Sequence, residues 1–91
     1  MRIELSHSAL KFLEKQDDKT KTRVFKKIKY LINSIEESGV IPYKTLDIKS
    51  LHGFWHPHKR LRIGKTRIIF IIDSDSNTIK ISEIDGRGDI Y

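Results

Sequence analysis

The spacing of apolar residues in the first half of the chain predicts a short strand followed by two helices. Residues 2–5 alternate between polar and apolar side chains, as a half-buried strand does. Apolar residues then recur at helical spacing over 9–13 and again over 19–34, with a polar break between the two stretches. Gly39 can adopt the left-handed conformation that ends a helix, so the second helix is expected to stop there.

The second half of the chain is rich in β-branched residues and predicts strands. Alternation over 58–63 and 78–84 indicates two strands with one buried face each, and the apolar run over 67–72 suits a central strand. Gly64-Lys65 fits a two-residue turn that would join the first and second of these as a hairpin. The expected fold class is α+β, in which an N-terminal strand and a two-helix hairpin pack on an antiparallel β-sheet.

Composition limits the number of domains, the chemistry and the partners that the protein can have. With 91 residues the chain is expected to be a single domain, 1–91, and without cysteine it can form neither disulfides nor a Cys-ligated metal site. Lys and Arg outnumber Asp and Glu by 18 to 12, and the net charge of +6 points to an anionic partner such as nucleic acid. The longest apolar run, 68–72, is too short to span a membrane, and the first residues lack the apolar stretch of a signal peptide. We therefore expect a cytoplasmic protein.

The most basic stretch of the chain lies on the expected hairpin. Residues 59–67 hold five cationic side chains and no acid. With the turn described above, Arg62 would lie directly across from Arg67, and Arg60 would lie two positions along on the same face. Like charges opposite each other destabilise a sheet, so this arrangement favours an anion such as a phosphodiester between the guanidiniums. The alternative is a solvated strand face whose long side chains are splayed apart.

A second cluster lies at the C-terminal end. Residues 85–91 run Asp-Gly-Arg-Gly-Asp-Ile-Tyr, and the glycines beside Arg87 would let the backbone bring its guanidinium close to a ligand. The Arg-Gly-Asp triplet is interpreted as a coincidence, because neither a signal peptide nor cysteines accompany it. Arg87 is therefore a further candidate for anion binding.

Two patterns that can bind metals are present but incomplete. His52, His56 and His58 could hold a metal ion, but no nearby carboxylate completes the set and the neighbours are cationic. Residues 73–77 begin like a calcium-binding loop, yet the sixth and twelfth positions lack the required Gly and Glu. The sequence therefore predicts no metal site, and a turn at 73–77.

Two aromatic residues, Phe54 and Trp55, follow Gly53 in the segment before the hairpin. Aromatic side chains beside a basic stretch can stack on nucleic-acid bases. Here they are predicted to close one end of the core instead, an interpretation that an exposed Trp55 would reopen.

Together these motifs resemble the RelE/ParE superfamily of toxins from prokaryotic toxin–antitoxin pairs, and its RelE branch in particular. The resemblance is carried by residues 51–53, 60–70, 81–85 and 87–91 and by the strand–helix–helix–sheet order, so it covers nearly the whole chain. Members look like small microbial ribonucleases, and the RelE branch cuts mRNA in the ribosomal A site without a metal. The resemblance thus implies a type II toxin that inhibits translation as a metal-independent, ribosome-dependent mRNA endonuclease. It implies no cofactor, and it implies an acidic RelB-like antitoxin that holds the toxin inactive.

The resemblance also implies roles for individual residues. Arg67 matches the arginine that contacts the scissile phosphate, and Arg87 matches one expected to stabilise the transition state. Tyr91 matches a C-terminal tyrosine that orients or deprotonates the attacking 2′-hydroxyl in some members, and Arg60 is the fourth expected catalytic residue. His58 stands where some active members have lysine, so Tyr91 and His58 are both candidates for the general base. Five residues are expected to bind RNA: Lys49, His58, Lys59, Arg62 and Lys65.

Two other functions are compatible with the same residues. A ParE-like inhibitor of DNA gyrase would bind its target without nuclease chemistry, and the helices would then matter more than the sheet. A non-catalytic domain that binds nucleic acid or protein would use the same basic scaffold without toxicity. Mapping of transcript ends in expressing cells separates mRNA cleavage from both.

Overall fold

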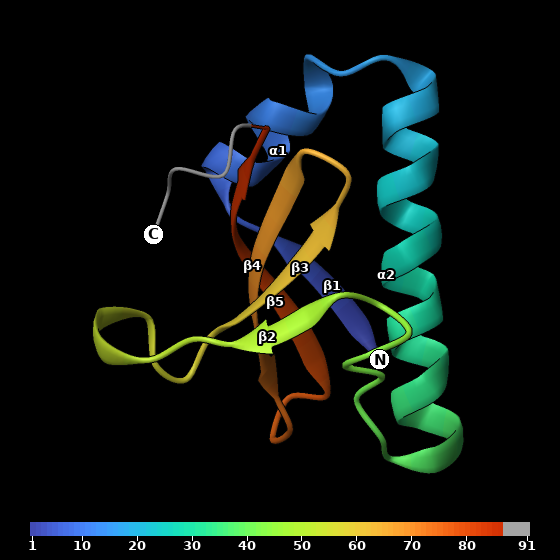
Figure 1. Cartoon of the computed structure of the whole chain (residues 1–91), viewed down its shortest axis with the longest axis vertical. Coiled ribbons are helices and arrows are strands. Elements are labelled where there is room, and N and C mark those ends of the chain that lie inside the picture. Colours follow the sequence, from blue (N-terminus) through green and yellow to red (C-terminus); the bar gives the residue numbers. More distant parts are fainter. Residues whose placement is uncertain (87–91) are drawn as a thin grey trace.

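The computed structural model describes residues 1–86, which form one five-stranded sheet and two α-helices (Figure 1). The sheet order is β1-β5-β4-β3-β2, with β1 parallel to β5 and the other neighbours antiparallel. In chain order the elements are β1 (Arg2–Leu5), α1 (His7–Glu14), α2 (Asp18–Ser38), β2 (Ile48–Ser50), the 3₁₀ turn η1 (Gly53–Trp55), β3 (Lys59–Ile63), β4 (Thr66–Asp73) and β5 (Thr78–Asp85).

The α+β fold class is confirmed, with two refinements of the expected sheet. The sheet is mixed, because the chain crosses from β1 through the helices and the other strands before β5 pairs beside β1 in parallel. The short strand β2 was not expected, since three residues are too few to show a period.

The helix ends follow the chemistry of their capping residues. Ser6 accepts a hydrogen bond from the backbone N–H of Ala9 at 3.1 Å, so it caps α1. Asp17 caps α2 in the same way, by accepting from the N–H of Thr20 at 2.8 Å. Gly39 ends α2 in the left-handed conformation, with φ of 69°, as the sequence predicts.

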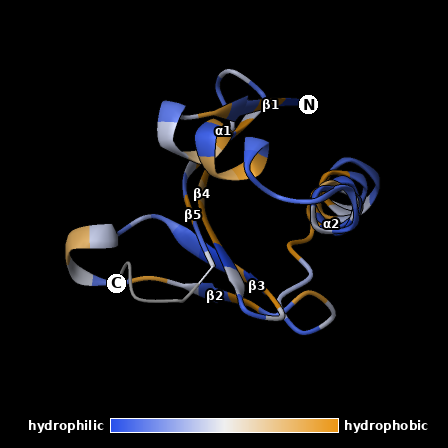
Figure 2. Cartoon of the chain, turned by 90° about the horizontal axis from the view of Figure 1, so that it is seen from above, coloured by the Kyte–Doolittle hydropathy of each residue, from blue (hydrophilic) through white to orange (hydrophobic). Residues whose placement is uncertain are grey.

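The two helices cover different parts of the sheet. They stand apart in both views: α1 packs against β5 and β1, whereas α2 lies across one face of the sheet (Figures 1 and 2). The core lies between that face and α2, where residues from the helix (Val24, Ile28, Leu31) meet residues from the strands (Ile48, Leu61, Ile63, Ile68, Phe70, Ile79, Ile81, Ile84). One face of β3 and β4 is therefore apolar and covered, and the other faces away from α2.

The prediction that Phe54 and Trp55 close one end of the core is wrong. The side chain of Phe54 is 92% exposed, and Trp55 lies outside the core cluster. The reason is that the loop between β2 and β3, to which both residues belong, projects away from the sheet (Figure 1). Residues 73–77 do form the predicted turn, in which the carboxylate of Asp73 accepts from the backbone N–H of Asp75 at 3.1 Å.

Candidate nucleic-acid interface

The β3–β4 hairpin places three arginines on one face of the sheet. Arg62 pairs directly with Arg67 and Arg60 with Ile69, so the predicted register is confirmed. Because neighbours along these strands belong to the core under α2, the three arginines lie on the opposite face. We call this the arginine face and define it by residues that share it through alternation and register: Lys49, Arg60, Arg62, Arg67, Ile69, Glu83 and Asp85.

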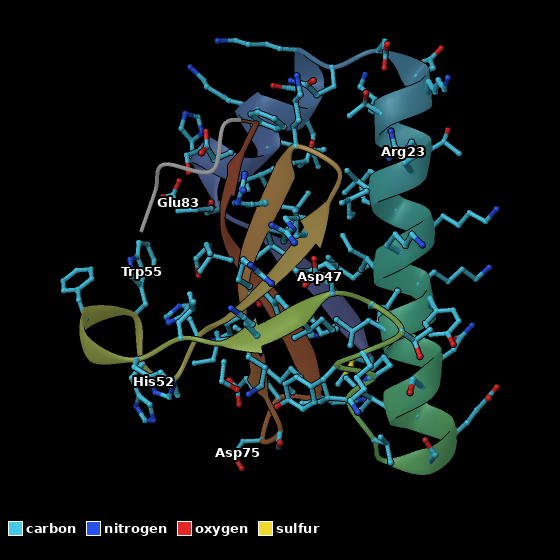
Figure 3. All side chains as sticks on the ribbon, in the orientation of Figure 1. Arg23, Asp47, His52, Trp55, Asp75 and Glu83 are labelled. Carbon is cyan, nitrogen blue, oxygen red and sulfur yellow. The ribbon has the colours of Figure 1, made fainter. Side chains whose placement is uncertain are left out.

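A carboxylate from outside the basic stretch 59–67 lies among the arginines. Asp47 accepts a hydrogen bond from Nη2 of Arg60 at 2.8 Å and another from Nε of Arg62 at 2.8 Å (Figure 3). The bond from Arg62 and the charge of Arg60 hold the pKa of Asp47 below its usual range. The protein itself thus supplies some of the negative charge that was expected beside the opposed arginines.

Arg60 is the buried member of the set. It is 6% exposed, and its Nε has no hydrogen-bond partner among residues 1–86. Arg62 is the open member, with 44% of its side chain exposed. The two adjacent cations therefore differ in kind: Arg60 is fixed beneath the face, whereas Arg62 can reach a ligand from it.

The remaining predicted basic residues divide between the two sides of the sheet. Lys49 lies opposite Arg60 and so shares the arginine face, and Lys65 is exposed in the hairpin turn. Lys59 does not join them, because alternation turns it to the other side. There its Nζ donates to the hydroxyl of Ser50 at 3.1 Å and lies 5.5 Å from the ring centroid of Tyr43. The hydrogen bond with Lys59 lowers the pKa of Tyr43.

His58 is held by hydrogen bonds at both ring nitrogens. Nδ1 lies 3.0 Å from the carbonyl oxygen of Trp55, and a carbonyl only accepts, so this nitrogen carries the hydrogen. Nε2 lies 3.2 Å from the hydroxyl of Ser82, from which the neutral ring accepts. His58 precedes Lys59, which pairs with Phe70, so it lies about 13 Å along the strands from Arg67. Ser82 had no marker in the sequence, since only the β-bulge at this point of β4 and β5 turns it toward His58.

The arginine face also includes acidic residues of β5. Glu83 lies opposite Ile69 and accepts a hydrogen bond from the hydroxyl of Ser8 at 3.2 Å (Figure 3). Asp85 lies opposite Arg67 in the adjacent strand. The face therefore carries both signs of charge, unlike the stretch 59–67 considered by itself.

Two predicted catalytic residues, Arg87 and Tyr91, lie outside the described residues 1–86. Within that part of the chain, no three His, Asp or Glu side chains gather in a way that could hold a metal ion. No helix among the same residues is long and apolar enough to cross a membrane.

Comparison with solved structures gives the same fold. The toxin in the archaeal RelE–RelB complex from Pyrococcus horikoshii OT3 has a TM-score of 0.73 at 21% identity, covering 97% of this chain and 96% of that one. A RelB–RelE antitoxin–toxin complex from Methanococcus jannaschii gives 0.61 at 24% identity, covering 90% and 87%. A metal-bound toxin from Helicobacter pylori gives 0.67 at 18% identity, covering 100% and 99%. None of the curated proteins matches the chain.

A family model matches almost the entire sequence. It describes the ParE toxin of the type II toxin–antitoxin system parDE, and the match runs over residues 3–91. Both the strands that carry the arginine face and the two helices lie inside this range. The chain therefore belongs to the ParE toxin family of type II toxin–antitoxin systems, within the RelE/ParE superfamily.

Proposed function

We propose that this toxin is a metal-independent endoribonuclease that cleaves mRNA in the ribosomal A site and so inhibits translation. One observation carries the proposal: Arg62 and Arg67 lie directly opposite each other on the face of the sheet away from α2, beside the buried Arg60, whose Nε has no hydrogen-bond partner among residues 1–86. A pair of like charges costs the sheet stability, and a phosphodiester between them would remove that cost. The arginine pair is therefore expected to be more stable with a bound anion than with water alone.

The chemistry requires no metal. The 2′-hydroxyl attacks the adjacent phosphorus and its proton passes to a base. The 5′-oxygen leaves and takes up a proton, so the chain breaks into a 2′,3′-cyclic phosphate and a 5′-hydroxyl. Negative charge concentrates on the pentacoordinate phosphorus, and fixed cations that bind it better than the ground state lower the barrier. Arg67 and Arg62 would contact this phosphate, and Arg60 would position them from below.

The remaining roles come from the family resemblance. Arg87 is proposed to stabilise the same transition state, and Tyr91 or His58 to take the proton of the 2′-hydroxyl. His58 lies four residues along the strands from the level of Arg67, so Tyr91 is the favoured base for the nucleotide whose phosphate Arg67 contacts. Lys49 and Lys65 would bind neighbouring phosphates, whereas Lys59 would bind RNA only from the other side of the sheet.

An acidic antitoxin is the proposed protein partner. The solved structures from P. horikoshii and M. jannaschii are complexes of RelE with RelB, and this chain shares their fold. With a net charge of +6, the chain would attract an acidic segment that folds as it binds. Co-expression with the product of an adjacent acidic reading frame should yield a stable complex.

Incubation with mRNA-programmed ribosomes tests the proposal. The wild type should cut mRNA in the A site, and Arg67→Ala should slow cleavage about 10²- to 10³-fold, the usual effect of removing one preorganised donor. Lys26→Ala on the exposed side of α2 is the matched control and should cleave at the wild-type rate. Wild-type rates in Arg67→Ala would contradict the assignment of that arginine, and uncut mRNA with the wild type would contradict the proposal.

Inhibition of DNA gyrase is the second candidate function, because the matching family model describes ParE toxins. The surface that binds gyrase would then lie on α2, where Phe25 is 42% exposed between lysines. Supercoiling by purified gyrase separates the two candidates. Inhibition that Phe25→Ala relieves and Arg67→Ala does not would favour gyrase as the target.

A further inference from the structure

The loop between β2 and β3 carries the most exposed aromatic side chain in the described part of the molecule. Phe54 is 92% exposed, although a phenylalanine ring is among the side chains that gain most from burial. In Figure 1 the loop extends far from the sheet, and in Figure 2 it lies on the side away from α2. It therefore projects on the same side as the arginine face.

The loop is held in shape by its own hydrogen bonds. The backbone N–H of Leu51 donates to the carbonyl of His58 at 3.0 Å and closes the loop at its base. Within it, the N–H of His56 donates to the carbonyl of Gly53 at 3.1 Å, and the ring of His58 bonds to the carbonyl of Trp55. Gly53 begins the turn with φ of 64°, a conformation that other residues rarely adopt.

Contacts between aromatic rings support the tip of the loop. Phe54 meets Trp55 edge to face, with ring centroids 5.6 Å apart and planes at 89°. Trp55 in turn meets His58 edge to face at 5.8 Å and 82°. The ring of Phe54 is thus supported at one edge while 92% of its side chain stays open to a ligand.

The charge around the loop restricts the kind of ligand. Residues 48–67 contain no Asp or Glu, and they include six Lys and Arg residues as well as three histidines. His52 and His56, on either side of the turn, are both exposed. A negatively charged partner with a flat or apolar group suits this loop, and an unpaired nucleotide has both properties.

We propose that Phe54 stacks on an unpaired base of single-stranded RNA and so fixes the strand whose phosphate lies at Arg62 and Arg67. The choice of RNA rests on the proposed function, whereas the stacking rests on the exposure and support of the ring. The base would belong to a nucleotide some positions along the strand from the cleaved bond, because the loop and the arginine pair lie at opposite ends of β3. Phe54 is then a residue that positions RNA, not a catalytic one.

Binding of a non-cleavable strand tests the proposal apart from catalysis. Fluorescence anisotropy would measure the affinity of a labelled 2′-O-methyl single-stranded RNA, which lacks the attacking hydroxyl. Phe54→Ala should weaken binding about 5- to 100-fold, the range measured for loss of one base–aromatic stack. Phe54→Trp should bind at least as well as the wild type, and Phe54→Leu, which is apolar but not planar, should bind as poorly as Phe54→Ala.

Two controls identify the interaction. Tyr30→Ala removes another exposed aromatic ring, on α2 at the far side of the sheet, and should leave the affinity unchanged. A strand of abasic nucleotides keeps the phosphates, so it should bind the wild type and Phe54→Ala equally.

Several outcomes would overturn the proposal. One is wild-type affinity in Phe54→Ala, another is full rescue by Phe54→Leu, which would indicate an apolar protein pocket as the partner, and a third is no RNA binding by the wild type. If the wild type binds through Phe54 but never cuts mRNA on ribosomes, the proposed function fails and the stacking site stands.

Discussion

The two faces of the sheet are built under different constraints. Toward α2, strands β3 and β4 present side chains such as Leu61, Ile68 and Phe70, each at most 1% exposed. On the arginine face, the same two strands present Arg60, Arg62 and Arg67. The apolar face needs only residues of suitable size, whereas each arginine needs a specific partner for its charge and its donors.

The contrast has an energetic consequence. Burial of the apolar face stabilises the fold by about 25 cal/mol for each Å² of surface removed from water. Burial of Arg60 costs free energy instead, and Asp47 offsets it only partly, because Nε stays without a partner among residues 1–86. The charged residues of the arginine face therefore contribute little to stability, which agrees with a role in binding.

The largest effect is expected on the apolar face. Phe70→Ala should lower the free energy of unfolding by about 3–5 kcal/mol, because it empties a fully buried site between α2 and the sheet. Ile71→Ala, at the next position and on the opposite face, should cost roughly 1 kcal/mol, since Ile71 is only half-buried. Urea denaturation measures both. Equal losses would show that the two faces do not differ as described.

On the arginine face, removal of the acid should cost more than removal of the buried cation. Asp47→Ala should lower the free energy of unfolding by about 1–2 kcal/mol, less than for a fully buried pair because 46% of the Asp47 side chain is exposed. Arg60→Met should be close to neutral, since it removes the buried charge together with its need for a partner. Urea denaturation would contradict this account if Arg60→Met were the more destabilising change.

The same contrast explains how much of the fold the sequence predicts. The apolar stripe of α2, its end at Gly39 and the register of Arg62 against Arg67 all depend on residues close together in sequence. Period and turn chemistry therefore predict them. Strand β2 has only three residues and shows no period, so neither it nor its neighbour Asp47 could be placed.

The candidate site is less predictable, because its chemistry comes from several strands. The stretch 59–67 contains no acid, yet Asp47 reaches it through the pairing of β2 with β3, and Glu83 and Asp85 border it from β5. Likewise, a β-bulge brings Ser82 to His58. Counts of charge along a sequence omit such neighbours, and for that reason the sequence predicted a purely cationic face.

The pH dependence of stability should report the Asp47 cluster. The bond from Arg62 lowers the pKa of Asp47 in the folded state, so the ionised carboxylate stabilises the fold at pH values above its unfolded pKa of about 4. This contribution is lost as the pH falls below that value. Asp47→Asn should therefore be less stable than the wild type by up to about 1 kcal/mol at pH 7. In chemical denaturation at a series of pH values, the difference should shrink below pH ~4; a constant difference would contradict the assignment.

The smallest effect is expected from the opposed arginines themselves. Directly opposite like charges destabilise a sheet by roughly 0.2–1 kcal/mol, so Arg62→Thr should cost less stability in the presence of Arg67 than in an Arg67→Thr background. A double-mutant cycle isolates this coupling from two other interactions, the bond of Arg62 to Asp47 and any interaction of Arg67 with Asp85 in the adjacent strand. Each of these appears in both halves of the cycle and therefore cancels. Near 1 M salt, where the screening length is about 3 Å, the coupling should nearly vanish. A favourable coupling would mean that the two guanidiniums stack rather than repel, and the face would then have no need of an anion between them.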